Sequence, residues 1–90
     1  MQNFYFTYGS DERFPFIGGW TIVAAPDYPA ACKAFNAIHP PRSGAMNCSE
    51  VYTEAEFNKT SMSGPAGNRG SRCHEVIALM VVRLDEEYGK

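Results

Sequence analysis

The stretch NFYFTY, residues 3–8, decides how the chain begins to fold. Phe4, Phe6 and Tyr8 alternate with Tyr5 and Thr7. The side chains of Phe4, Phe6 and Tyr8 should therefore lie on one face of a strand. A period of two is typical of a half-buried β-strand, because successive side chains of a strand point to opposite faces. Residues 9–13 have turn chemistry, and Trp20–Ala24 is again rich in β-forming residues. The pattern predicts a long-looped antiparallel hairpin.

The segment after the hairpin predicts the main helix of the protein. Asp27 is a favourable N-cap, and Pro29 falls in the first turn, where its missing N–H costs nothing. His39, followed by two prolines, ends the helix, and the negative end of the helix dipole gives a structural reason for a histidine there. Apolar residues recur at three- and four-residue spacing and predict one apolar stripe, made of Tyr28, Ala31, Phe35 and Ile38.

The second half of the chain predicts two further strands and a short helix. Residues 46–52 predict a third strand, and Thr53 and Glu56 form a capping box that starts a helix to about residue 60. The glycine- and serine-rich residues 61–71 predict a loop. The strongest β segment runs over 73–84, and its nearly unbroken apolar residues 76–82 predict a central strand that is covered on both faces.

These elements predict a single domain of the α+β class over residues 1–90. Their order is β-β-α-β-short α-β, which gives a small, mostly antiparallel sheet of three to four strands with one main helix packed on one face. Ninety residues are near the lower limit for one hydrophobic core, so a second domain is not expected. The polar residues 85–90 are predicted to be a flexible tail.

Composition and charge exclude several classes of function. The net charge of −2 and the pI of about 5.6 argue against direct nucleic-acid binding, which needs a basic face. Cys32, Cys48 and Cys73 include no C-x-x-C pair, which predicts free thiols in a reducing cytoplasm and no metal site. No apolar run reaches the ~18 residues of a membrane-spanning helix, and the N-terminus does not resemble a signal peptide.

No arrangement typical of catalysis is visible in the sequence. Cys73 and His74 are neighbours in a predicted strand, so their side chains point to opposite faces and cannot act on each other, whereas Cys73 and Glu75 should share a face. His39 and His74 are the only histidines, and neither belongs to a known metal-binding motif. We therefore predict a non-enzymatic binding protein without a cofactor.

Two segments are candidates for a binding site. The loop over residues 64–72 exposes backbone N–H groups at its glycines, and its two arginines can hold an anion, although it is not a Walker A motif. Trp20 follows two glycines, which would leave its ring open for stacking on a purine. Together these features predict a site for a nucleotide-like anion, made of Tyr5, Trp20, Asn68, Arg69, Arg72 and His74.

Other interpretations of the same residues stay open. The loop can be a connection whose arginines are solvated, and Trp20 can be the largest core residue of a small domain. If the aromatic side chains and the arginines do not converge, the aromatic residues instead predict a patch for a protein partner, with Phe14 and Phe16 in the interface.

Short motifs that suggest a family are spread over most of residues 3–77. They are FYFTYG (4–9), GGW (18–20), Ala31, Phe35, HP (39–40), NC (47–48), VYTE (51–54), EF (56–57), Thr60, GN (67–68) and CHEVI (73–77). In these motifs the chain resembles a family of short proteins from gut bacteria and their phages and mobile elements. The loop 64–71 is richer in small residues than that family pattern.

The resemblance implies a context of phage accessory proteins, which often inhibit host antiviral defence. We therefore expect an anti-defence protein in the cytoplasm of the host bacterial cell that acts by sequestering a nucleotide-like immune signal. A second interpretation is a protein-binding inhibitor of an immune effector, such as an anti-CRISPR protein that occludes a nuclease. A third is a regulatory accessory module without an inhibitory role. The sequence is compatible with a homo-oligomer.

Overall fold

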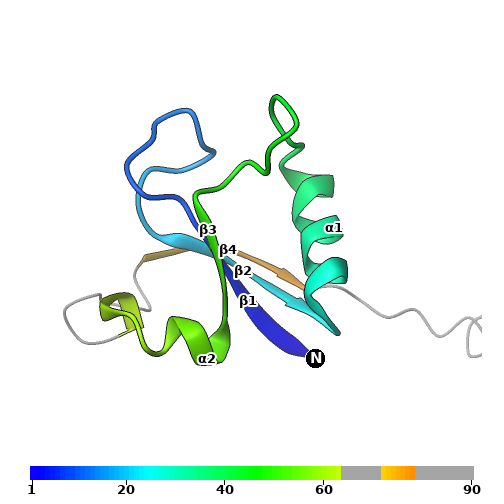
Figure 1. Ribbon diagram of the computed structural model, residues 1–90, viewed down its shortest axis with the longest axis vertical. Coiled ribbons are helices and arrows are strands. Elements are labelled where there is room, and N and C mark those ends of the chain that lie inside the picture. Colours follow the sequence, from blue (N-terminus) through cyan, green and yellow to red (C-terminus); the bar gives the residue numbers. More distant parts are fainter. Residues whose placement is uncertain (64–71, 79–90) are drawn as a thin grey trace, which may run out of the picture.

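The computed structural model describes residues 1–63 and 72–78 of the chain (Figure 1). These residues form a mixed four-stranded sheet with one main helix and one short helix, which confirms the predicted α+β class. The helices lie on opposite sides of the sheet (Figure 1). The predicted tail, residues 85–90, lies outside the described residues, as do the last residues of the predicted C-terminal strand.

The sheet has the strand order β3-β1-β2-β4. β1 (Gln2–Thr7) and β2 (Trp20–Ala25) form the predicted antiparallel hairpin at the centre, and β3 (Glu50–Thr53) pairs antiparallel with β1. β4 (Cys73–Ala78) pairs parallel with β2. The prediction of a central C-terminal strand is therefore wrong, because β4 has a strand on one side only in the described part of the chain.

Burial along the strands explains this difference. β1 is buried on both faces from Phe4 onward, so the prediction that it is only half-buried is wrong. β4 instead alternates between half-buried and exposed residues, and Val76 is 64% exposed. The apolar residues of β4 reflect β propensity more than burial, since a strand at the edge of the described sheet has fewer neighbours to cover it.

Helix α1 (Tyr28–Ile38) covers one face of the sheet. The Asp27 side chain caps it as predicted, because its Oδ1 accepts a hydrogen bond of 2.9 Å from the Ala30 N–H. Phe35 stacks on Phe6 of β1 with ring centroids 4.4 Å apart. Tyr28 and Ile38, at the two ends of the predicted apolar stripe, are 49% and 54% exposed, although the Tyr28 ring still makes an edge contact with Phe4 of β1. The buried part of the stripe is therefore its middle, Ala31 and Phe35.

Helix α2 (Glu54–Phe57) covers the other face and starts at the predicted capping box. The Glu56 N–H donates to Thr53 Oγ1 at 3.1 Å, and the Thr53 N–H donates to Glu56 Oε1 at 2.9 Å. Phe57 stacks on Tyr5 with ring centroids 4.0 Å apart, so α2 contributes one large side chain to this core. The helix is shorter than predicted and is followed by the 3-10 turn η1 (Ser61–Ser63).

The third strand is also shorter than the predicted 46–52. A tight reversal precedes it, in which Ser43 and Gly44 have φ angles of +52° and +80°, and Arg42 and Ala45 form an isolated bridge. Met46 and Cys48 then pack against the core on the α1 side instead of joining the sheet. The strand begins only at Glu50, where the chain comes beside Thr7.

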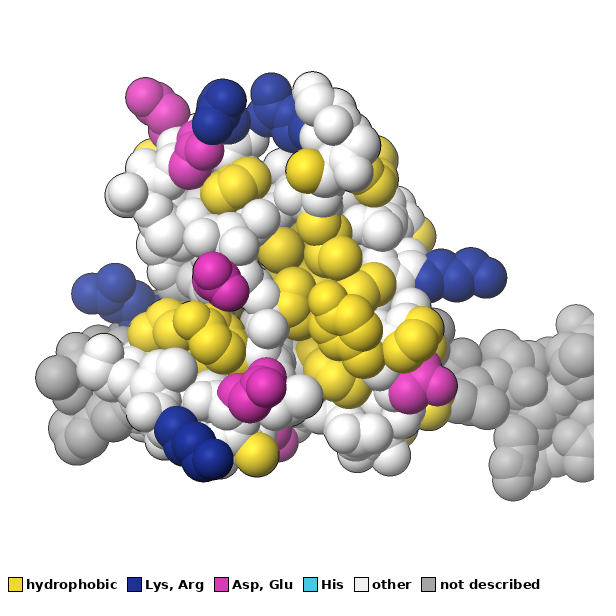
Figure 2. Space-filling view, viewed as in Figure 1, with side chains coloured by type: hydrophobic (Ala, Val, Ile, Leu, Met, Phe, Trp, Pro, Cys, Tyr) yellow, Lys and Arg dark blue, Asp and Glu magenta, His cyan; other side chains and the backbone are white. Residues whose placement is uncertain are grey.

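The outer surface shown in Figure 2 carries apolar side chains across its centre, whereas the lysines and arginines lie near its margins. No helix in the described ranges has the length and apolar character to span a bilayer.

The two faces of the sheet predict how substitutions should act on stability. Phe6 is 0% exposed in the central strand, so Phe6→Ala should lower the free energy of unfolding by about 3–5 kcal/mol. Val76→Ala is the control, because this exposed side chain should change it by no more than about 0.5 kcal/mol. Urea denaturation measures both values. A loss at Val76 as large as that at Phe6 would place the core elsewhere.

Candidate functional site

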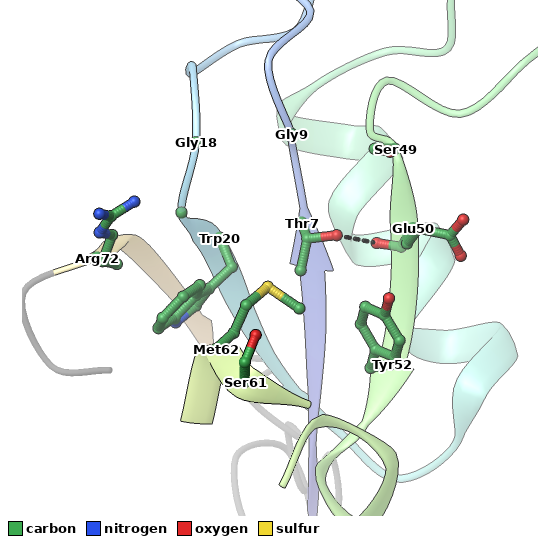
Figure 3. Close-up of a pocket in the computed structure, with 11 residues that line it drawn as sticks. Thr7, Gly9, Gly18, Trp20, Ser49, Glu50, Tyr52, Ser61, Met62 and Arg72 are labelled. Carbon is green, nitrogen blue, oxygen red and sulfur yellow. Dashed lines mark hydrogen bonds between the residues drawn. The ribbon is translucent and has the colours of Figure 1, made fainter. Parts of the chain in front are cut away.

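A pocket of about 470 Å³ lies at one end of the sheet, between the C-terminal end of β1 and the N-terminal end of β2 (Figure 3). Residues from β1, β2 and β3 line it, together with η1 and the residue that precedes β4. Segments from both halves of the chain therefore meet at this pocket.

The sheet contributes a row of three side chains to the pocket. Thr7 lies opposite Trp20 on one neighbouring strand and opposite Glu50 on the other, and all three line the pocket. Directly opposite residues on adjacent strands project from the same face. The Thr7 hydroxyl donates to the backbone oxygen of Glu50 at 3.2 Å, which ties the row together. The sheet register thus fixes the order Glu50, Thr7, Trp20 along one wall.

Two charged side chains of opposite sign line the same pocket. Arg72 lies directly before β4, and Glu50 begins β3. Both residues are exposed, and neither side chain has a hydrogen-bond or ion-pair partner within the described residues. These two groups are therefore available to a ligand.

Gly19 allows the start of β2 to approach the start of β4. Its φ angle is +69°, and a Cβ atom built there would lie 2.2 Å from the backbone oxygen of Arg72 and 2.7 Å from Nε2 of His74. A side chain at this position would collide with the backbone of Arg72 and with the ring of His74. Only glycine fits this conformation and this contact without displacement.

His74 holds the loop between β1 and β2. Its Nε2–H donates to the backbone oxygen of Gly18 at 2.7 Å, and its ring stacks on Phe16 with centroids 4.5 Å apart. His74 does not line the pocket, although it was predicted to bind the ligand. Its contacts position Gly18, which does line the pocket.

The structure brings together only part of the predicted site. Trp20 and Arg72, both named in the predicted site, line the same pocket. Tyr5 is 1% exposed and stacks on Phe57, so the prediction that its ring is open for a ligand is wrong. Trp20 is also 1% exposed, so it is chiefly a core residue, and its indole N–H is buried without an acceptor within residues 1–63 and 72–78. Asn68 and Arg69 lie outside the described residues.

The aromatic residues predicted to form a protein interface are not an exposed connection. Phe14 and Phe16 are both half-buried against the core on the α1 side. Phe14 also lines a second pocket of about 290 Å³, together with Arg13, Arg42 and Met46. Arg13 forms an ion pair of 2.8 Å with Asp11, and its hydrogen bonds lower the pKa of that carboxyl to about 2. The positive charge of Arg42 is therefore less neutralised than that of Arg13 in this second pocket.

A chain of polar side chains crosses the α1 side of the sheet. The Thr21 hydroxyl donates to Glu75 Oε1 at 2.9 Å, so the Tyr8 hydroxyl is the donor in its own hydrogen bond with Thr21. Nε2 of His39, at the C-cap of α1, pairs with the same Glu75 oxygen. This chain joins the helix end to β4, which gives His39 a partner besides the helix dipole.

Sequence reasoning missed Glu50 and placed Glu75 on the wrong face. The pairing of β4 with β2 is irregular at one point: Cys73 lies opposite Trp20, and Glu75 lies opposite the next residue, Thr21. Cys73 and Glu75 therefore lie on opposite faces, and the prediction that they share a face is wrong. Cys73 packs in the cluster around Trp20, whereas Glu75 points toward α1. The bulge has no local signature in the sequence. An acidic residue at the start of a strand, such as Glu50, looks like an ordinary solvated charge until the register is known.

Comparisons of the chain with models of protein families, with curated proteins and with solved structures find no match.

The close contact at Gly19 leads to a prediction with a matched control. Gly44 also has a positive φ angle, +80°, but no atom lies within 4 Å of a Cβ built there. Gly44→Ala should cost about 1–2 kcal/mol of stability from backbone strain alone. Gly19→Ala carries the same strain and should lose about 1–3 kcal/mol more from steric overlap. Equal losses in thermal or urea denaturation would show that β2 and β4 do not approach as described.

The buried hydroxyl of Tyr8 predicts a dependence of stability on pH. Burial raises its pKa from 10.0 to about 12. A phenol with a raised folded-state pKa contributes stability that is complete below pH 10 and is lost as the pH rises toward 12. The slope should be about −1.4 kcal/mol per pH unit in that interval. Unfolding of Tyr8→Phe, measured in parallel, should lack this component. Parallel curves for the two proteins would mean that Tyr8 ionises normally.

Proposed function

We propose that the protein is a non-enzymatic binding protein that holds a small anionic ligand with a planar ring, such as a nucleotide, in the 470 Å³ pocket. The observation that best supports this function is that Arg72 and Trp20, which lie far apart in the sequence, line the same pocket. Arg72 can supply the charge for an anion, whereas Trp20 is 1% exposed, so it forms part of the pocket wall and leaves most contact with a ring to other lining residues.

The chemistry of the pocket suits such a ligand. A guanidinium group forms paired, charge-assisted hydrogen bonds with a phosphate, and Arg72 has no competing partner in the described ranges. Tyr52 and Met62 add apolar contact surface for a ring. The volume falls within the range of about 300–1,000 Å³ that is usual for small-molecule sites.

Binding is favoured over catalysis by the composition of the lining. Within the described part of the chain, the pocket is lined by no histidine or cysteine, the side chains that most often supply a base or a nucleophile near neutral pH. Retention of the ligand without turnover is what a sequestering protein requires. The proposal is therefore a phage or mobile-element protein that acts in the bacterial cytoplasm and removes a nucleotide-like signal of host antiviral defence. The family resemblance supplies this context by analogy.

The second pocket favours another function, a protein-binding inhibitor of an immune effector. Phe14 and Met46 line it beside Arg42, and aromatic residues with arginine are typical of the residues that dominate protein interfaces. Its volume of about 290 Å³ is smaller, so it is better suited to one side chain of a partner than to a whole nucleotide.

The proposed function predicts a selective effect of Arg72. Arg72→Ala should weaken nucleotide binding about 10- to 100-fold, because one charge-assisted hydrogen bond to a ligand contributes about 1.5–3 kcal/mol. Arg13→Ala is the matched control, since Arg13 lies outside this pocket and is paired with Asp11. Titration calorimetry with mononucleotides and cyclic dinucleotides measures the affinities.

The alternative function, binding of a protein partner, predicts different results for these variants. If no nucleotide binds, or if Arg72→Ala leaves affinity unchanged, the proposed function is wrong. If, in addition, Phe14→Ala abolishes inhibition of an immune effector while the variant remains folded, the second pocket is the contact with a protein partner.

A further inference from the structure

Glu50 is a feature of the pocket that anion binding does not explain. Glu50 lines the same pocket as Arg72, yet the two side chains form no ion pair with each other. In Figure 3 the Glu50 carboxylate lies on the outer side of β3, so this exposed side chain has to turn toward the pocket to meet a ligand. A carboxylate in this place repels a ligand that is only an anion. The ligand should therefore present a hydrogen-bond donor to Glu50 at one end and an anionic group to Arg72 at the other.

The sheet keeps these two charges apart. Glu50 lies on β3 and Arg72 directly precedes β4, which are the two outer strands in the order β3-β1-β2-β4. Three inter-strand spacings separate these strands by roughly 14 Å of backbone. In Figure 3 Arg72 and Glu50 stand on opposite sides of the pocket, with Trp20 and Thr7 between them. A ligand that contacts both must be elongated.

We infer, on the basis of the proposed function, that the pocket prefers a guanine nucleotide. The Glu50 carboxylate accepts the N1–H and exocyclic N2–H groups of the base, and the Arg72 guanidinium binds the phosphate. An ionised carboxylate is an acceptor with two oxygens, and guanine presents two donors side by side on one edge. Each oxygen then receives one donor.

The other bases do not match this arrangement. Adenine and cytosine each place one amino donor beside a ring nitrogen that is an acceptor, so one carboxylate oxygen would face a lone pair. Uracil places its single N–H between two carbonyl acceptors. A ligand group that is repelled by the carboxylate, or that leaves one of its oxygens unpaired, binds more weakly.

The surroundings of Glu50 suit a planar base. Tyr52 is two residues further along β3, so it projects from the same face of the sheet and also lines the pocket. Its ring and the Met62 side chain can contact the face of the base while Glu50 reads its edge. An α-amino acid also has both charges, but its ammonium and carboxylate share one carbon atom and are too close together to reach Glu50 and Arg72.

Titration calorimetry of GMP, AMP and free glycine with the full chain tests this inference. The wild-type protein should bind GMP at least 10-fold more tightly than AMP and should not bind glycine. Glu50→Gln replaces one acceptor oxygen with a donor, so it should weaken GMP at least 10-fold while leaving AMP unchanged or tighter. Arg72→Ala should weaken both nucleotides by the same factor. Glu12→Gln, outside the pocket, is the matched control.

The outcomes separate this inference from the proposed function. Equal affinity for GMP and AMP, or an equal effect of Glu50→Gln on both, would overturn guanine recognition and leave nucleotide binding intact. Glycine binding that depends on Glu50 would also overturn it. No binding of any nucleotide would remove both. Because Glu50 is exposed, an unchanged melting temperature of Glu50→Gln should show that altered binding is not a loss of fold.

Discussion

The burial of β1 on both faces is the constraint on which the rest of the structure depends. A domain of ninety residues can bury few strands, and here most of the buried residues lie in the central hairpin of β1 and β2. Phe6 stacks on Phe35 of α1 on one face, and Tyr5 stacks on Phe57 of α2 on the other. Because a shift of one residue would exchange these faces, the two stacks fix the register of β1.

That register determines what lies in the pocket. With Thr7 opposite both Trp20 and Glu50, the last residue of β1 brings one side chain from each neighbouring strand onto the face covered by α2. Gly19 adds the second condition, since its missing side chain lets the backbone at Arg72 approach β2. The arrangement of the candidate site thus follows from strand pairing and from one glycine, and requires no special conformation of the charged residues themselves.

Local signals in the sequence predicted the local elements correctly. The Asp27 N-cap, the capping box of Thr53 and Glu56, and the alternation of residues 3–8 each depend on residues close together in the chain. Strand order depends on contacts between distant segments, and the apolar composition of β4 was compatible with a central or an edge position. The β-bulge between Cys73 and Glu75 puts these two residues on opposite faces of the sheet. The neighbouring sequence contains no signal that predicts this bulge.

The same distinction applies to the candidate site. Trp20 and Arg72 could be predicted because Gly19 directly precedes Trp20 and Arg72 ends a glycine-rich segment, and glycine permits close approach of a backbone. Glu50 could not be predicted, because its importance comes from lying opposite Thr7 and from the absence of a partner in the described residues.

The length of α2 adds a reason for the position of the pocket. Four residues, with Phe57 as their buried side chain, cover Tyr5 and Trp20 but leave the sheet end near Gly9 and Gly18 uncovered. On the face packed by the longer α1, hydrogen bonds join Tyr8, Thr21, Glu75 and His39 across the sheet. The proposed nucleotide site therefore lies on the α2 side, and the polar chain on the α1 side joins the end of α1 to β4.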